Sequence, residues 1–396
     1  MYGHGCGVEQ SDVEAAFKKA AEQGNSVAQY CLAVLYREGR CVAKSDKTSA
    51  RWCIKAAEQG HAEAQHNLGV YLEEGFGVTQ NYEEAARWYR KAAAQGDVKA
   101  QYSLGNMLLN GRGVTRSFSA AVRCYEMSAK QDFAPAQFNL GNMFEKGRGV
   151  TESDKEAARW YRKSADQGLA QAQGLLGHFF EEGRGVPQSD VEAVKWYKKS
   201  ADQGYAEAQL RMGFMYEAGR SVAQSDVEAV LWIRKAADQG SPLAQCNMGL
   251  FSLSGRGIGQ SDVEAARWFR MAADQGNLLA QVRLGRLYYS GRGVLQNCAE
   301  SFQWFKKAAE QGHTESQHML GAMYLNSQGV MQSNAEAAHW YQKAAAQGYS
   351  PALFDLGTLY DEGRGVVQSA DEVVKCWQKA ADQGHPEAQY NIGHCA

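Results

Sequence analysis

The sequence predicts an all-α solenoid built from about eleven helix-turn-helix repeats of 36 residues each. Three observations lead to this fold class. The segment from Gly147 to Gly168 recurs with few changes at 183–204, 219–240 and 255–276. Each repeat holds two stretches with the apolar spacing of an amphipathic helix, and no proline interrupts a predicted helix. Because one helix pair cannot bury its apolar face alone, neighbouring repeats must stack.

The first helix of each repeat is typified by residues 64–72, Ala-Gln-His-Asn-Leu-Gly-Val-Tyr-Leu. Its apolar residues follow the i, i+4, i+7, i+8 spacing that places side chains on one helical face. A glycine recurs in the middle of this helix, as at Gly69, Gly105 and Gly141, with Ala33 in the first copy. Since glycine costs about 1 kcal/mol relative to alanine inside a helix, its recurrence predicts close contact with another helix.

A linking segment with the pattern Gly-x-Gly-Val follows, for example at 147–150. It lacks the Gly-Lys-Ser/Thr of a phosphate-binding loop and follows no strand, so its recurrence indicates a turn. The second helix then begins with capping-box spacing, as in Ser153 and Glu156. A tryptophan such as Trp160 recurs in this helix, and we expect it to pack between repeats. A glycine such as Gly168 ends the helix.

The repeat accounts for nearly the whole chain, so residues 1–396 are predicted to form a single repeat solenoid. The sequence opens within a Gly-x-Gly-Val segment and stops at Ala396, partway through a first helix. Neither end has the polar capping repeat that solenoids need for solubility. We therefore expect a fragment of a longer protein, or a protein whose caps come from elsewhere.

Charge and composition restrict the kinds of partner. The net charge is −2 with both signs interspersed, which argues against nucleic acid. No run of about 18 apolar residues occurs, so we expect no membrane span in this chain. The nine cysteines have no fixed place in the repeat, which does not fit a disulfide framework. This usage is typical of a reducing compartment, and we expect the cytoplasm, although a missing end could carry a signal or an anchor.

No residue set in the sequence predicts a catalytic site, a metal site or a cofactor. Cys31, Cys41, Cys53 and His61 are close in sequence, but neither Cys-x-x-Cys nor His-Glu-x-x-His occurs. The histidine pairs of the repeat have i, i+5 spacing, which does not place two imidazoles on one helical face. We expect these histidines to be solvated or to cap helices.

The repeat reads Ala-x-x-x-Leu-Gly-x-x-Tyr-x-x-Gly-x-Gly-Val-x-x-Asp and then x-x-x-Ala-x-x-Trp-Tyr-x-Lys-Ala-Ala-x-Gln-Gly. This pattern closely resembles the Sel-one-like repeat family, a relative of the tetratricopeptide repeats, over essentially the whole chain. The resemblance implies a right-handed α/α superhelix that serves as a scaffold or adaptor and is not an enzyme. One cysteine-rich branch of the family is described as β-lactamase-like, with a disulfide in every repeat. This chain lacks that regular cysteine pairing.

By analogy with tetratricopeptide units, the first helices should line the groove of the solenoid. Apolar residues gather at the free positions of the middle repeats, and we predict that they bind a protein or peptide partner: Leu210, Phe214, Leu243, Cys246, Leu250, Leu253, Leu279, Val282 and Tyr289. Alternatively, these residues complete the packing between successive first helices. Three functions remain open: a non-catalytic scaffold whose groove takes a helix or extended peptide, a β-lactamase-like hydrolase, or a structural spacer.

Overall fold

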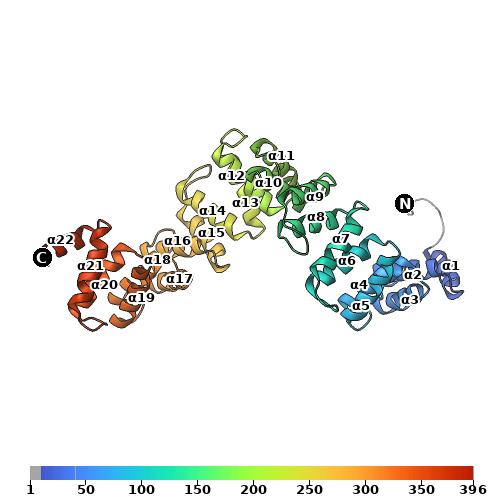
Figure 1. Cartoon of the computed structure of the whole chain (residues 1–396), viewed down its shortest axis with the longest axis horizontal. Coiled ribbons are helices and arrows are strands. Elements are labelled where there is room, and N and C mark those ends of the chain that lie inside the picture. The colour runs from blue at the N-terminus through green and yellow to red at the C-terminus, as the bar shows by residue number, and fades with distance from the viewer. Residues whose placement is uncertain (1–9, 41, 396) are drawn as a thin grey trace. The chain divides into compact units, whose positions relative to one another are not determined.

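The computed structural model describes residues 10–40 and 42–395, and all regular secondary structure in these ranges is helical (Figure 1). The first helices of the repeats are α2 (Ser26–Glu38), α4 (Ala62–Glu74), α6 (Val98–Asn110), α8 (Ala134–Glu145), α10 (Ala170–Glu182), α12 (Ala206–Ala218), α14 (Pro242–Ser254), α16 (Leu278–Ser290), α18 (Thr314–Leu325), α20 (Ser350–Glu362) and α22 (Pro386–Cys395). The second helices are α1 (Gln10–Glu22), α3 (Asp46–Glu58), α5 (Tyr82–Ala94), α7 (Phe118–Ala129), α9 (Asp154–Asp166), α11 (Asp190–Asp202), α13 (Asp226–Asp238), α15 (Asp262–Asp274), α17 (Cys298–Glu310), α19 (Asn334–Ala346) and α21 (Ala370–Asp382). The predicted all-α repeat fold is confirmed. None of the helices in the described ranges is long and apolar enough to cross a membrane.

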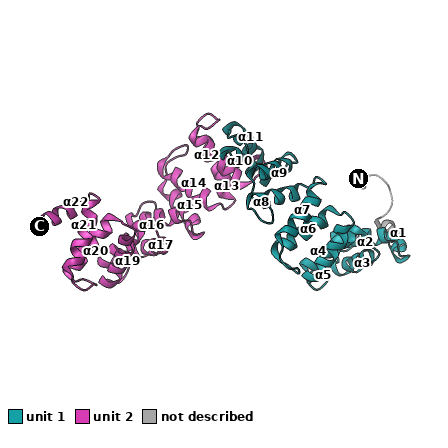
Figure 2. Cartoon of the chain, in the orientation of Figure 1, with its two compact units in different colours: residues 1–200 teal, residues 201–396 magenta. Residues whose placement is uncertain are grey.

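The chain forms two compact units, residues 1–200 and 201–396 (Figure 2). The boundary falls within α11, so it follows no break in the repeat pattern. In each compact unit the most extensive packing joins the two helices of one repeat. The next most extensive joins a second helix to the first helix that follows it. This nearest-neighbour packing is the arrangement expected of a repeat protein.

The recurrent glycine of the first helix lies against a ring on the second helix of the same repeat. A Cβ atom on Gly249 in α14 would lie 2.6 Å from Cε1 of Phe269 in α15. Carbon atoms in van der Waals contact are about 3.5–4.0 Å apart, so a ring can approach this closely only when the helix offers no Cβ. In the first copy, Ala33 stands at the glycine position and the smaller Cys53 stands at the position of the ring, and both are buried in one cluster. The predicted close helix contact is confirmed.

Buried glutamines connect successive repeats. Gln29, which is 4% exposed, donates from Nε2 to the carbonyl of Ala21 at the end of α1 (3.0 Å). Its Oε1 accepts from Nε2 of Gln59 after α3 (2.7 Å). The same side-chain pair recurs as Gln95–Gln65, Gln131–Gln101, Gln167–Gln137, Gln239–Gln209, Gln275–Gln245, Gln311–Gln281 and Gln347–Gln317. Each buried glutamine thus bridges the C-terminal ends of two successive second helices.

The Gly-x-Gly-Val segment is a turn that contacts the preceding repeat. Gly111 and Gly113 have φ angles of 70° and 62°, in the left-handed region where glycine is favoured. A Cβ atom on Gly113 would clash with the backbone of Tyr82 at the start of α5. In a later repeat, Arg292 of this segment donates to Asp262 at the start of α15 (2.7 Å). The predicted structural role of the segment is therefore confirmed.

The predicted capping box forms only in part. The Oγ atom of Ser153 accepts from the backbone N–H of Glu156 (3.3 Å), as a capping residue should. The backbone N–H of Ser153, however, donates to the carbonyl of Phe144 in α8 (3.0 Å) and so does not need the glutamate. The Glu156 carboxylate instead lies 3.4 Å from the guanidinium of Arg159. The serine half of the capping box therefore forms as the spacing predicts. The glutamate half does not form, because a carbonyl of the first helix accepts from the Ser153 N–H in place of the Glu156 carboxylate.

Candidate protein-binding surface

The nine residues predicted to bind a partner lie on α12, α14 and α16 of the second compact unit, and three of them are buried. Leu210, Cys246 and Val282 are 1%, 1% and 4% exposed. Leu210 belongs to the cluster around Ile233, and Cys246 to the cluster around Phe269. These three side chains complete helix packing, as in the alternative considered above, because their column faces the second helices.

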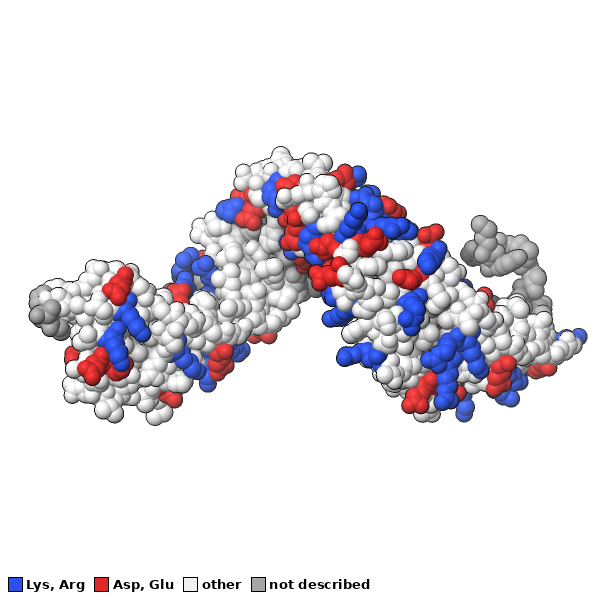
Figure 3. Space-filling model, viewed as in Figure 1, with Lys and Arg blue, Asp and Glu red and all other residues white. Residues whose placement is uncertain are grey.

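The other six residues reach the surface. Leu243 and Leu279 are 49% and 44% exposed, at the same place in consecutive repeats. The remaining four are half-buried: Phe214, Leu250, Leu253 and Tyr289. We call these six residues the apolar patch. Few charged side chains lie over α14 and α15 in Figure 3. The apolar patch is a surface feature, whereas its role in binding stays a prediction.

A small hollow borders the apolar patch. It has a volume of about 250 Å³ and is lined by Glu217, Asn247, Leu250, Phe251, Ser254 and Arg256. Its charges neutralise each other, because Arg256 lies 3.1 Å from Glu217 and 2.7 Å from Asp226. Hydrogen bonding to Asp226 raises the pKa of the Arg256 guanidinium, which therefore stays charged. The hollow thus presents Leu250 and Phe251 between groups that are already paired.

Arg283 on α16 differs from the other cations of this surface. Arg211 pairs with Glu207, and Arg286 pairs with Glu315. Within the part of the chain that the structure describes, Arg283 has no ion pair, and its Nε atom is buried without a hydrogen-bond partner. Burial raises the pKa of the nearby Cys246 thiol to about 11, and Arg283 opposes this rise only in part. The thiol is therefore neutral near pH 7 and leaves the Arg283 charge unbalanced.

The histidines and cysteines form no chemical centre in the described ranges. His61 and His313 cap α4 and α18, with Nδ1 accepting from the backbone N–H of Ala64 (3.3 Å) and Ser316 (3.1 Å). The expected capping role is confirmed for these two histidines. The other members of the two pairs, His66 and His318, are half-buried and pack against the rings of Tyr89 and Tyr341, so they are neither solvated nor caps. No group of three or more His, Cys, Asp or Glu side chains that could hold a metal occurs among the described residues. The free thiols are Cys31, Cys53, Cys124, Cys246, Cys298 and Cys376. Cys6 and Cys41 lie outside the described residues.

The tryptophans pack between repeats, as expected. Trp304 of α17 is buried in a cluster with α16 of its own repeat and α15 of the preceding repeat. The ammonium of Lys307, one turn further along α17, lies 4.0 Å from the centre of its ring. The same Lys–Trp contact recurs at Lys55–Trp52, Lys91–Trp88, Lys163–Trp160, Lys199–Trp196, Lys235–Trp232 and Lys343–Trp340. The i, i+3 spacing of these residues is a sequence signal that the prediction above did not use.

Comparisons with known proteins agree with this architecture. The family model described as Sel1 repeat matches eleven times, at residues 1–25, 26–61, 62–97, 98–133, 134–169, 170–205, 206–241, 242–277, 278–313, 314–349 and 350–385. A search of curated proteins gave no match.

Two of the solved structures that are similar to the chain are Sel1-type repeat proteins. One is a protective antigen with an SLR fold that is present in uropathogenic Escherichia coli strains. It is 34% identical, with a TM-score of 0.80, over 96% of this chain and 82% of that one. The other is a Sel1 repeat protein from Oxalobacter formigenes, 33% identical with a TM-score of 0.58, over 78% of this chain and 90% of that one. Sel1 repeat proteins are generally protein-interaction scaffolds. The repeats, the helix pairing and these matches together show that the chain belongs to the Sel1 repeat family.

Proposed function

We propose that this protein is a non-catalytic scaffold that binds a helix or extended peptide of a partner protein on the apolar patch. The observation that carries the proposal is the exposure of Leu243 and Leu279 in consecutive repeats. The same position holds Glu63, Glu207 and Glu315 in other repeats. A surface position that changes from carboxylate to leucine in two adjacent repeats favours contact with an apolar partner.

Arg283 adds a polar requirement to this surface. Its guanidinium lacks a carboxylate partner in the described structure, and it shares α16 with Leu279. A buried or half-buried cation gains most when a binding partner supplies the missing acceptor, since leaving it unpaired costs free energy. We therefore propose a partner segment that carries apolar side chains for Leu243 and Leu279 and a carboxylate for Arg283. Arg211 on α12 and Arg286 on α16 already have carboxylate partners, Glu207 and Glu315.

The test uses the two exposed leucines, because changing them should not affect folding. The double variant Leu243→Glu with Leu279→Glu is compared with Leu231→Glu, which alters a leucine of similar exposure (50%) on the second helix α13. We expect both variants to keep the helical circular dichroism and the melting midpoint of the wild type. Affinity capture should lose its partner proteins with the double variant and keep them with Leu231→Glu. If the wild type, the double variant and Leu231→Glu all recovered the same proteins, the apolar patch would not be the binding surface.

A further inference from the structure

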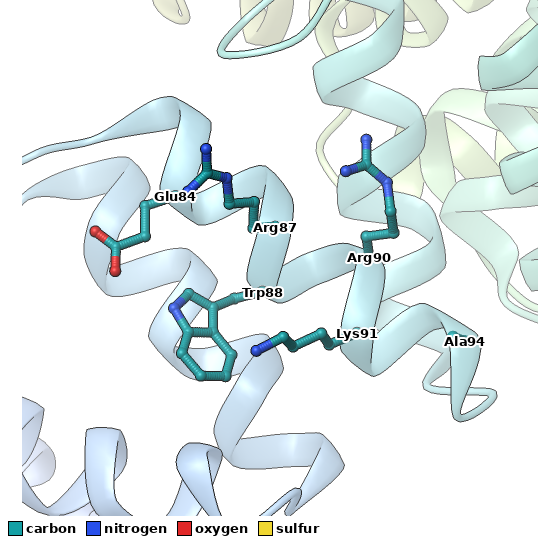
Figure 4. A pocket seen from close by; sticks show the side chains of 6 residues that line it. All are labelled: Glu84, Arg87, Trp88, Arg90, Lys91 and Ala94. Atoms are coloured by element: carbon teal, nitrogen blue, oxygen red, sulfur yellow. The ribbon is translucent and has the colours of Figure 1, made fainter.

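Basic side chains gather on one face of α5, which belongs to the first compact unit, whereas the apolar patch belongs to the second. Arg87, Arg90, Lys91 and Trp88 line a hollow of about 560 Å³ together with Glu84 and Ala94 (Figure 4). Lysine and arginine side chains are visible together over α5 in Figure 3. The hollow is within the size range of about 300–1,000 Å³ that is usual for ligand pockets.

Three later repeats carry an arginine at the position of Arg90: Arg162, Arg234 and Arg270. Aromatic rings cover Arg162 and Arg270, whereas Arg234 has no such ring contact in the described structure. Two repeats later, the guanidinium of Arg162 lies 5.2 Å from the ring centre of Phe180 and 5.9 Å from that of Trp196. Five repeats later, Arg270 lies 5.3 Å from the rings of both Tyr288 and Trp304. These contacts are cation–π interactions that hold the arginine against the next repeat.

Arg270 also has an acidic partner. Its guanidinium lies 3.7 Å from the carboxylate of Glu300. Glu300 and Trp304 both belong to α17 and are spaced i, i+4, so they lie on one face of that helix. The protein thus shows in its own structure what an arginine at this position binds: a carboxylate and an aromatic ring presented by one helix.

All three partners are missing around Arg90. Leu108 stands in place of Tyr288, Ala120 in place of Glu300, and Cys124 in place of Trp304. Among the described residues, Arg90 has no ion pair and no ring beside its guanidinium. A second hollow of about 390 Å³ lies beside Arg90 and Leu108, and Glu83, Ala86, Arg87, Gly113, Val114 and Thr115 also line it. The substitutions have therefore uncovered the arginine and opened space beside it.

The neighbouring charges also differ from those of other repeats. Arg159 and Arg267, the counterparts of Arg87, lie 3.4 Å and 3.7 Å from the glutamate one turn before them. Arg87 makes no such pair in the described structure, and the carboxylate of Glu84 points away from it in Figure 4. Lys91 lies 4.0 Å from the ring centre of Trp88. Two unpaired guanidinium groups therefore face the two hollows.

We propose that this site binds a helix of a partner protein that presents a carboxylate and an aromatic side chain at i, i+4, as Glu300 and Trp304 do at Arg270. The carboxylate pairs with Arg90 and Arg87, and the aromatic ring occupies the hollow beside Leu108. A nucleic-acid phosphate is the less favoured anion, because Glu84 borders the first hollow, Glu83 borders the second, and the chain carries a net charge of −2.

The probe for the test is a stapled alanine–glutamine helix that keeps only a glutamate and a tryptophan at i, i+4, labelled with fluorescein. Its binding to the full chain is measured by fluorescence anisotropy. We expect saturable binding that weakens by about tenfold or more in Arg90→Gln, since one charge-assisted hydrogen-bonded pair is lost. The matched control Arg270→Gln, at an arginine that is already covered, should leave the Kd unchanged. Peptides with the glutamate changed to glutamine, or the tryptophan to alanine, should also bind about tenfold more weakly.

A second variant fills the site from within. The double variant Leu108→Tyr with Cys124→Trp gives Arg90 the two aromatic residues that cover Arg270. This variant should therefore no longer bind the peptide, and its melting midpoint should not fall. The proposal is overturned if the wild type shows no saturable binding, or if the filled variant binds as tightly as the wild type. Displacement of the peptide by a single-stranded oligonucleotide, with equal binding of the two control peptides, would instead assign the site to phosphate.

Discussion

The contact between the mid-helix glycine and the facing ring gives a quantitative prediction. A methyl group added by Gly249→Ala would lie 2.6 Å from Cε1, 2.7 Å from Cδ1 and 2.8 Å from Cζ of Phe269. Ordinary contact needs about 3.5 Å, so the ring must move by about 1 Å. Phe269 is 0% exposed, so the ring can move only against its buried neighbours. Overpacking of this kind costs about 1–3 kcal/mol.

The helix propensity of alanine opposes this loss of stability. Alanine favours the helix over glycine by about 1 kcal/mol. We therefore expect Gly249→Ala to lower the local unfolding free energy by about 1 kcal/mol, within a range of about 0–2 kcal/mol. The matched control is Gly285→Ala, where the nearest ring atom, Cε1 of Phe305, is 3.1 Å from the added carbon. There the ring needs to move by only about 0.4 Å, so the helix term should win and the protein should be unchanged or slightly more stable.

The assay is native-state hydrogen exchange followed by mass spectrometry of peptides from α14 and α15. Local exchange is the right quantity, because the stability of a repeat protein is distributed over neighbouring repeats and global unfolding need not be two-state. The Ala33–Cys53 pair supplies a suppressor: Phe269→Cys should cost less in the Gly249→Ala background than alone. If Gly249→Ala proved as stabilising as Gly285→Ala, the steric explanation of the glycine column would be refuted.

Two further predictions concern the helix cap and the glutamine bridges. Burial lowers the pKa of His313 below its ordinary value of 6.5, with Glu315 opposing the shift, so the unfolded chain binds the proton more tightly. Its contribution to stability is therefore full above about pH 6.5 and is lost as the pH falls through the lowered folded-state pKa. His313→Asn, which copies the non-titrating cap Asn277, should make the melting midpoint less sensitive to pH between about 7 and 5, and an unchanged pH profile would contradict this. Gln245→Leu removes the hydrogen bonds to the Gln275 amide and the Ala237 carbonyl, which keep one other partner each, the Met271 carbonyl and the Gly240 N–H. At about 0.5–1.5 kcal/mol for each lost bond, local stability around α13 and α15 should fall by about 1–3 kcal/mol in hydrogen exchange, whereas no loss would show that the bridges do not contribute.

The sequence alone determined the repeat, the helix pair and the joints, because each depends on residues that recur every 36 positions. Gly249 could be assigned to a close helix contact from its recurrence, and Ser153 to a helix start from its spacing. Every repeat must make the same helix contacts, so the residues that make them recur at a fixed spacing and can be recognised from the sequence alone.

The tertiary structure decided which side of a helix each remaining residue faces and what lies opposite it. Leu210 and Leu243 were equally plausible groove residues in sequence, yet one is 1% exposed and the other 49%. The sequence does not single out Arg90. The residues that replace its partners, Leu108, Ala120 and Cys124, lie 18, 30 and 34 positions further along the chain. Contacts between repeats join residues that are distant in sequence, and only the packed helices show which arginine is covered and which is left open.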